Sequence, residues 1–280
     1  KSTLLRLIIS MLTNSKFKNL SIYIKLFIKV LKKRKWNKAL FLDLFISDLH
    51  LSYYSKSKPS FTTVFLNGFA HLQHHYLFSS KFYDGNQQNP NWYIDNNVDP
   101  FPDALDIYDR ILEQHFKTFA NHEIVVATGL QQVPYIRTKF YYRLKNHKEF
   151  MRLIDEKVNI YARMTRDFLI ECENNKHAKN IEKKLNTITL NNEKFFGEID
   201  NRGNSLFVSL TYPFEISAND ILIIPGYNNV SVMNHVVFVA IKNGMHDSLG
   251  YVFSTNPSEK FKKLNGFHVC NLNNYILSKY

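Results

Sequence analysis

Cysteine is scarce in this chain of 280 residues, which contains only Cys172 and Cys270. The two lie far apart in the sequence, and neither belongs to a C-x-x-C motif. This scarcity argues against a disulfide framework and against a zinc site built from thiolates. We therefore expect a protein of a reducing compartment, with a cytoplasmic localisation.

Long hydrophobic runs are also missing. The run LLRLIISML near the start contains Arg6 and is shorter than the roughly 20 apolar residues that a membrane-spanning helix needs. It also lacks the initiator methionine and the small-residue cleavage site of a secretory signal. Because the sequence begins without methionine and inside a helical pattern, we expect it to be the C-terminal fragment of a longer chain.

Acidic residues are absent before Asp43, whereas eleven lysines and arginines lie between Lys1 and Lys38. The whole chain has a formal net charge of +12. Such a basic segment is typical either of a solvated helix face or of a contact with an anionic surface. We keep both readings open, and we find no motif for specific nucleic-acid recognition.

Apolar residues are abundant, at 45% of the chain with 23 Phe and 16 Tyr, which excludes a disordered protein. Helical spacing predicts helices over 3–35, 39–54 and 103–119, and runs of β-branched and aromatic residues predict buried strands over 61–67 and 123–130. This alternation is typical of a parallel sheet with helices on both faces. The predicted fold class is therefore α/β, a three-layer α/β/α sandwich with a mostly parallel central sheet.

The predicted organisation has a basic helical segment over 1–58 and an α/β core over 59–280. A helical and hairpin insertion is expected over roughly 141–212, with a mostly helical part from Tyr141 to Asn186 and a hairpin turning at Asn201 to Asn204. Within the helical part, Arg163 and Arg166 could hold an anion or form a salt-bridged surface. A strand, a loop containing His246 and a short strand then follow.

Imidazoles are concentrated after the first predicted strand, in the run FLNGFAHLQHHY. Ligands of doubly wound sheets bind beyond the carboxyl ends of the strands, where this run, Gln131 with Gln132, and His246 all fall. The glutamines could bind a phosphate or a sugar hydroxyl, or could cap a turn. The histidines are either site residues or a polar helical turn; a zinc-protease helix is excluded because Leu72 replaces its glutamate.

The order Asn67-x3-His71, a later strand-exit loop, and His246-x3-Gly250-x2-Phe253 resembles the alkaline phosphatase-like superfamily. The likeness is to its type I phosphodiesterase and nucleotide pyrophosphatase branch, and it covers roughly residues 36–280. It implies that Asn67, His71 and His246 bind one divalent metal, zinc or, as the alternative, manganese. Candidates for an additional site are His74, His75, Gln131 and Gln132.

Three departures from that family pattern limit what the resemblance implies. Asn67 is a neutral residue where the family has a carboxylate. The segment VVATGLQQ stands where the family has Asp-His-Gly, and the segment that supplies the nucleophile is not found, so the catalytic residues are unknown. The expected function is metal-dependent hydrolysis of a phosphoester, or of a sulfoester or glycan substituent. The substrate would be a phosphorylated small molecule, nucleotide, lipid or glycan. The alternatives are a catalytically degenerate binding member of the same fold and a basic protein that docks on a membrane or partner.

Overall fold

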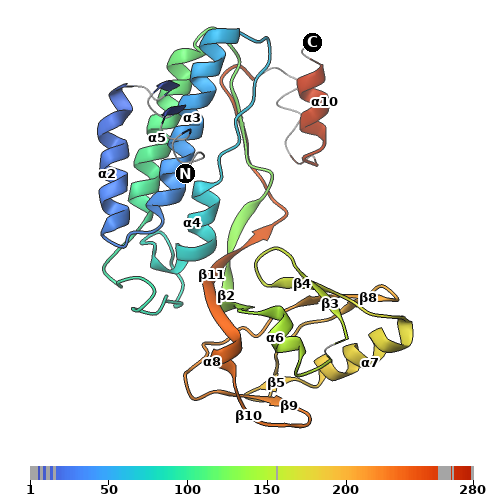
Figure 1. Ribbon diagram of the computed structural model, residues 1–280. Helices are drawn as coiled ribbons and strands as arrows, with labels where there is room; N and C mark the ends of the chain where they lie inside the picture. Colours follow the sequence, from blue (N-terminus) through green and yellow to red (C-terminus); the bar gives the residue numbers. More distant parts are fainter. Residues whose placement is uncertain are drawn as a thin grey trace. The chain divides into compact units, whose positions relative to one another are not determined.

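The computed structural model describes residues 6, 9–10, 13–14, 17–155, 157–257, 266 and 268–278 (Figure 1). The chain divides into two compact units: unit 1 comprises Lys1–Pro134 with Gly244–Tyr280, and unit 2 comprises Tyr135–Asn243. The expected insertion, residues 141–212, lies within unit 2. Across the described residues, no helix combines the length and the apolar character that a bilayer span requires.

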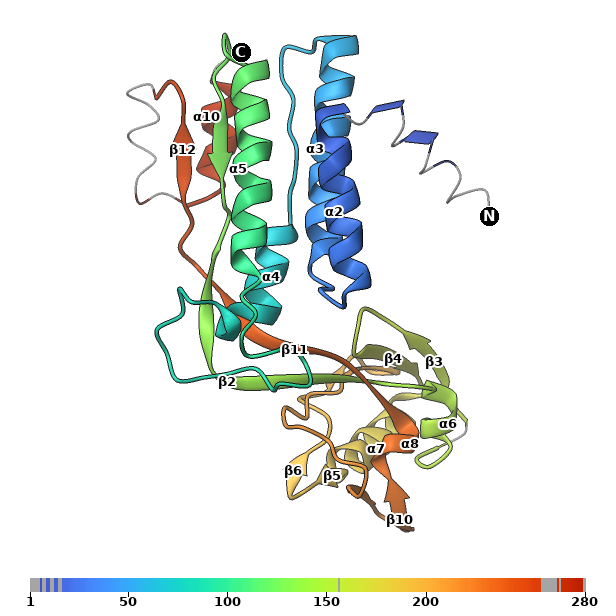
Figure 2. The same ribbon diagram turned by 90° about the vertical axis from the view of Figure 1, so that its left-hand side faces the viewer.

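Unit 1 is mainly helical. Its three long helices, α2 (Leu20–Leu31), α3 (Asn37–Ser57) and α5 (Phe101–Thr118), lie side by side (Figure 2). The shorter elements are η1 (Phe17–Asn19), α4 (Gly68–Tyr76), η2 (Leu77–Ser79) and α10 (Asn271–Leu277). The predicted helices over 39–54 and 103–119 are confirmed as α3 and α5. Apolar periodicity gives α5 a face to bury, whereas the buried face of α3 also contains polar residues, among them Asp43 and Asp48.

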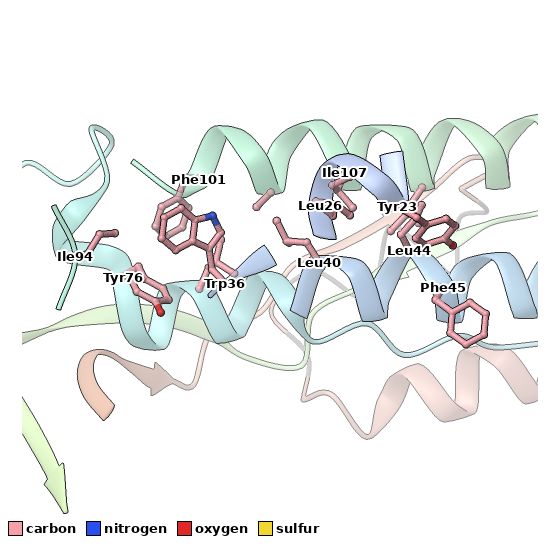
Figure 3. Close-up of a cluster of buried hydrophobic side chains, with 13 residues drawn as sticks. Tyr23, Leu26, Trp36, Leu40, Leu44, Phe45, Tyr76, Ile94, Phe101 and Ile107 are labelled. Atoms are coloured by element: carbon pink, nitrogen blue, oxygen red, sulfur yellow. The ribbon is translucent and has the colours of Figure 1, made fainter. Parts of the chain in front are cut away.

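The core of unit 1 is formed by side chains from all four α-helices of residues 20–118 (Figure 3). Leu40, Leu44 and Leu72 are fully buried. Trp36 packs edge-on against Tyr76, with ring centroids 5.5 Å apart. This packing fixes α4 against α3 and α5, so that one face of α4 is committed to the core.

The prediction of a mostly parallel central sheet is wrong. The described strands form small antiparallel sheets. In unit 1, β1 (Val125–Ala127) pairs with β12 (Val252–Ser254). The segment 61–67, predicted as a buried strand, has no regular secondary structure, is not buried and belongs to none of the described sheets. Its composition favours extended backbone, yet a composition does not specify a partner strand.

Two long strands cross the boundary between the units. They are β2 (Gln131–Leu144) and β11 (Val236–Asp247), which are neighbours in a two-stranded sheet. His246 lies near the end of β11, so the prediction that it occupies a loop is wrong. The short strand predicted after it is confirmed as β12.

Unit 2 combines two four-stranded sheets with short helices. One sheet has the order β3 (Asn159–Ala162), β4 (Asp167–Glu171), β8 (Ser205–Ser209), β7 (Asp200–Asn201). The other has the order β10 (Tyr227–Ser231), β9 (Ile221–Ile224), β5 (Thr189–Leu190), β6 (Glu193–Lys194). The helices are α6 (His147–Met151), α7 (Asn175–Asn186) and α8 (Val232–His235).

The sequence predictions for unit 2 are confirmed in one part and wrong in another. The hairpin expected to turn at Asn201 to Asn204 is confirmed as β7 and β8. The mostly helical structure expected from Tyr141 to Asn186 is wrong, because β3 and β4 form a hairpin there. In β4, Phe168 and Ile170 are buried and their neighbours are not, which is the period of two of a half-buried strand.

Candidate metal-binding site

The histidine-rich segment is helix α4, and its first turn is held by two residues from neighbouring helices. The carboxylate of Asp43, on α3, accepts hydrogen bonds from the amides of Gly68 (2.6 Å) and Asn67 (3.3 Å). The hydroxyl of Tyr108, on α5, accepts from the amide of Phe69 (3.0 Å) and donates to Asp43 (2.5 Å). Amides that would otherwise lack a partner at a helix start are thus satisfied by tertiary contacts.

Asp43 and Tyr108 together stabilise the start of α4 through hydrogen bonds. Asp43 is 3% exposed, and its negative charge is stabilised by three donors. Burial, followed by the hydrogen bond to Asp43, raises the pKa of Tyr108 far above its ordinary value, so Tyr108 remains a neutral donor. Together they set the position and rotation of α4, and therefore the direction of its histidines.

Asn67, predicted as a metal ligand, lies directly before α4 and is exposed. Its backbone carbonyl accepts from the amide of His71 (2.9 Å), and its side chain makes no capping hydrogen bond to the helix. His71 is exposed and lies one helical turn from His75, with ring centroids 4.6 Å apart. His75 is buried to 9% exposure beside the core of unit 1.

His74 is the imidazole of α4 that contacts His246. The two Nε2 atoms are 3.1 Å apart, and the ring centroids are 4.8 Å apart. The two residues are 172 positions apart in the sequence. The prediction paired His246 with Asn67 and His71, whereas the contact that the structure gives is between His246 and His74.

The backbone carbonyl of Gly244 orients the ring of His74. The Nδ1 atom of His74 lies 2.8 Å from this oxygen, which can only accept, so Nδ1 carries the proton. In the neutral ring, Nε2 is then left with a lone pair that points toward His246. A histidine whose other nitrogen donates to a carbonyl has the arrangement found in metal-ligating imidazoles.

Gln132 completes this cluster from the start of β2. Its Nε2 atom lies 3.1 Å from Nε2 of His74, and its Oε1 atom is buried without a hydrogen-bond partner. The oxygen and nitrogen of an amide can exchange places by rotation of the group. In the rotated form, the oxygen rather than the nitrogen would lie 3.1 Å from His74 Nε2, beside the two imidazole nitrogens.

Gln131 has a different environment from its neighbour. Its amide nitrogen donates to the carboxylate of Asp247 (2.7 Å), and its amide oxygen accepts from the hydroxyl of Tyr251 (3.1 Å). The hydrogen bonds from Gln131 and from the Ser248 amide lower the pKa of Asp247. Gln131 therefore joins the start of β2 to the end of β11, and Asp247 is engaged in that contact.

The cluster formed by His74, His246 and Gln132 contains two imidazoles and one amide. No group of three or more His, Cys, Asp or Glu side chains able to hold a metal occurs among the described residues. A tetrahedral zinc with Zn–N bonds of about 2.0–2.1 Å places two ligand nitrogens roughly 3.3–3.4 Å apart. The 3.1 Å separation of the two Nε2 atoms is close to that value, so the pair fits a metal ion with open positions.

Sequence reasoning missed three residues that build this arrangement: Asp43, Tyr108 and Gly244. Asp43 did have a signal, since it is a carboxylate between apolar neighbours on a predicted helix. Gly244 had none, because its role depends on close packing. A Cβ atom there would lie 2.8 Å from the carbonyl oxygen of Gln73 and 3.1 Å from Gln132 Oε1.

Comparisons of the chain with protein-family models, with curated proteins and with solved structures found no match. The resemblance to the alkaline phosphatase-like superfamily is therefore neither supported nor refuted by a relative, and it stays a prediction.

Proposed function

We propose that the chain binds one divalent transition metal, zinc or manganese, through His74 and His246, and that it acts as a metal-dependent hydrolase on a phosphoester. The observation that carries the proposal is the pair of Nε2 atoms 3.1 Å apart, with Nδ1 of His74 donating to Gly244. The buried oxygen of Gln132, which has no partner, supports a third ligand from the same cluster. A metal bound there would polarise a phosphoryl oxygen and activate a water molecule.

The residues around His74 would orient the metal ligands, and none of them is assigned as a nucleophile. Gly244 keeps the proton of His74 on Nδ1, and Asp43 with Tyr108 holds the helix that carries His74. Two imidazoles and an amide are neutral ligands, so the metal would keep its positive charge for an anionic substrate. Asn67, His71 and His75 then have no role as ligands, and the nucleophile stays unassigned.

Hydrolysis of bis(4-nitrophenyl) phosphate tests this function. We expect turnover that requires added zinc or manganese, that a chelator abolishes, and that His74→Ala and His246→Ala reduce to the background. His122→Ala is a matched control, because His122 contacts Tyr54 and Phe119 away from the cluster. Turnover that is unchanged in His74→Ala would contradict the proposal. Metal binding without turnover would favour the alternative of a degenerate binding protein.

A second candidate function, docking on an anionic membrane, is favoured by one further observation. Five large apolar residues of α2 are exposed, and they recur at helical spacing along one face: Leu20, Ile24, Phe27, Ile28 and Leu31. Exposed lysines, including Lys25 and Lys32, flank this stripe. An apolar stripe edged by cations is the pattern of a helix that lies in the interface of an anionic bilayer.

Sedimentation with vesicles separates this candidate from the hydrolase. Under docking, the protein binds vesicles that contain phosphatidylserine, binds pure phosphatidylcholine vesicles weakly, and loses binding in Phe27→Glu. Met164→Glu makes the same change of charge at an apolar residue that is 81% exposed in unit 2, and it should bind normally. Equal loss in the two variants would show that net charge alone governs the contact.

A further inference from the structure

A second charged feature lies in unit 2, on one face of β2. Side chains along a strand alternate between its two faces. Phe140, Tyr142 and Leu144 are buried, whereas Tyr135, Arg137, Lys139 and Tyr141 have the opposite parity and are at least partly exposed. The strand therefore presents cations and tyrosines together on one face.

Two further cations from other segments join this face. Arg166, in the turn between β3 and β4, lies over the ring of Tyr141 at 4.0 Å, and Lys242 of β11 lies 5.7 Å from the same ring. Lys139 lies 4.1 Å from the ring of Tyr135, and Arg137 lies 4.9 Å from the ring of Phe214. We call Arg137, Lys139, Arg166 and Lys242 the cation cluster.

The cations of this cluster repel one another. Burial, and then the charges of Arg137 and Arg166, lower the pKa of Lys139; burial, and then Arg166, lower that of Lys242. Within the described part of the chain, no carboxylate forms an ion pair with Arg137, Lys139 or Arg166. The aromatic rings compensate the positive charge only in part, because a cation–π contact contributes less than an ion pair with a desolvated anion.

We propose that the cation cluster is a binding site for a ligand that carries two or more phosphate groups. Several cations drawn together from β2, the β3–β4 turn and β11 create a local field that attracts a multiply charged anion. The arginines supply forked donors suited to phosphate oxygens, and the lysines supply point charges. The site lies in unit 2 and does not involve the histidine cluster, so it goes beyond the proposed hydrolase function.

A single-stranded nucleic acid fits this cluster less well than an oligophosphate does. Binding of single strands depends on aromatic rings on which bases stack. Here a face of the Tyr141 ring is covered by Arg166, and the Tyr135 ring by Lys139. The charged groups of the ligand, rather than an aromatic base, should therefore make the contacts.

Titration calorimetry with inorganic tripolyphosphate, without added metal, tests the proposal. We expect binding at low salt that weakens as salt rises, and that weakens about tenfold or more in Lys139→Gln with Arg166→Gln. Arg137→Gln alone, at an exposed position, should weaken it in the same direction. The control pair Lys176→Gln with Lys179→Gln removes the same charge from the exposed surface of α7 in the same unit.

Three outcomes would overturn the proposal. The first is no heat of binding at low salt, and the second is equal weakening in the control pair, which would reflect net charge only. The third is an oligothymidylate of similar charge binding much more tightly than tripolyphosphate, which would assign the site to stacked bases. Thermal unfolding of each variant shows whether it is folded. If the double variant Lys139→Gln with Arg166→Gln does not fold, the affinity of Arg137→Gln for tripolyphosphate tests the proposal instead.

Discussion

The carboxylate of Asp43 lies 2.6 Å from the amide nitrogen of Gly68, at the first turn of α4. A Cβ atom at position 68 would lie equally close to that carboxylate and 3.3 Å from the backbone of α3 at Ala39. The absence of a side chain at Gly68 therefore lets α3 approach the start of the histidine helix.

Gly68→Ala should destabilise the protein by about 1–3 kcal/mol, because the added methyl group displaces a buried carboxylate from its donors. Urea unfolding measures this change. Gly129→Ala is the matched control: a Cβ there meets no atom within 4 Å, and the residue is exposed. The control should change the free energy of unfolding by less than about 0.5 kcal/mol. Equal effects of the two substitutions would show that the Asp43–Gly68 contact does not support α4.

The stability of unit 1 should depend on the protonation of His50. Its Nδ1 and Nε2 atoms lie 3.1 Å from Nε2 of His115 and 2.8 Å from Oγ1 of Thr62. Burial, and then the charge of His115, lower the pKa of His50 from 6.5. The unfolded chain therefore binds a proton more readily, so this stability is complete above about pH 6.5 and is lost as the pH falls below that value.

Urea midpoints at pH 7.5 and pH 5.5 measure that dependence. The midpoint of the native protein should fall on acidification, and that of His50→Gln should fall less. His147 and His235 in unit 2 also have pKa values lowered chiefly by burial. Their protonation reduces the stability of the native protein and of His50→Gln alike. The difference between the proteins therefore isolates His50, and an identical fall in both would refute the assignment.

Gln132 should tune metal affinity if its buried oxygen is a ligand. Gln132→Glu replaces the amide with a carboxylate, a common zinc ligand, and should raise zinc affinity about tenfold. Gln132→Met should lower it. Gln131→Met removes the neighbouring amide that bonds Asp247 and Tyr251, and it should leave the affinity unchanged. Competition with a chromophoric chelator measures the three variants, and similar affinities for both methionine variants would remove Gln132 from the site.

The long helices of unit 1 could be predicted from the sequence, whereas most of the strand pairing could not. Helical signals indicated α3 and α5 because a helix satisfies its backbone hydrogen bonds within one segment. Strand signals correctly located β1 and β12, but the hydrogen bonds of a strand depend on a partner that composition does not specify. The prediction therefore joined 61–67 and 123–130 into a parallel sheet that the structure does not contain.

The candidate site was predictable in outline but not in its contacts. The sequence led to the prediction that Asn67 and His71 would lie beside His246, with His74 and His75 in a possible additional site. It could not show that His74 makes the contact, because the rotation of α4 is set by Asp43 and Tyr108 from distant helices. Likewise, Gln131 and Gln132 are adjacent in sequence but differ in their contacts. The amide of Gln131 forms hydrogen bonds with Asp247 and Tyr251, whereas the amide oxygen of Gln132 is buried without a hydrogen-bond partner.

The metal content of the purified chain tests the central claim most directly. After equilibration with zinc and removal of excess metal, we predict about one zinc per chain in the native protein and in His71→Ala. His74→Ala and His246→Ala should each retain almost none, while circular dichroism shows that they remain folded. A native protein that retains no zinc, or a His74→Ala variant that retains it fully, would contradict the assignment of this pair as a metal site.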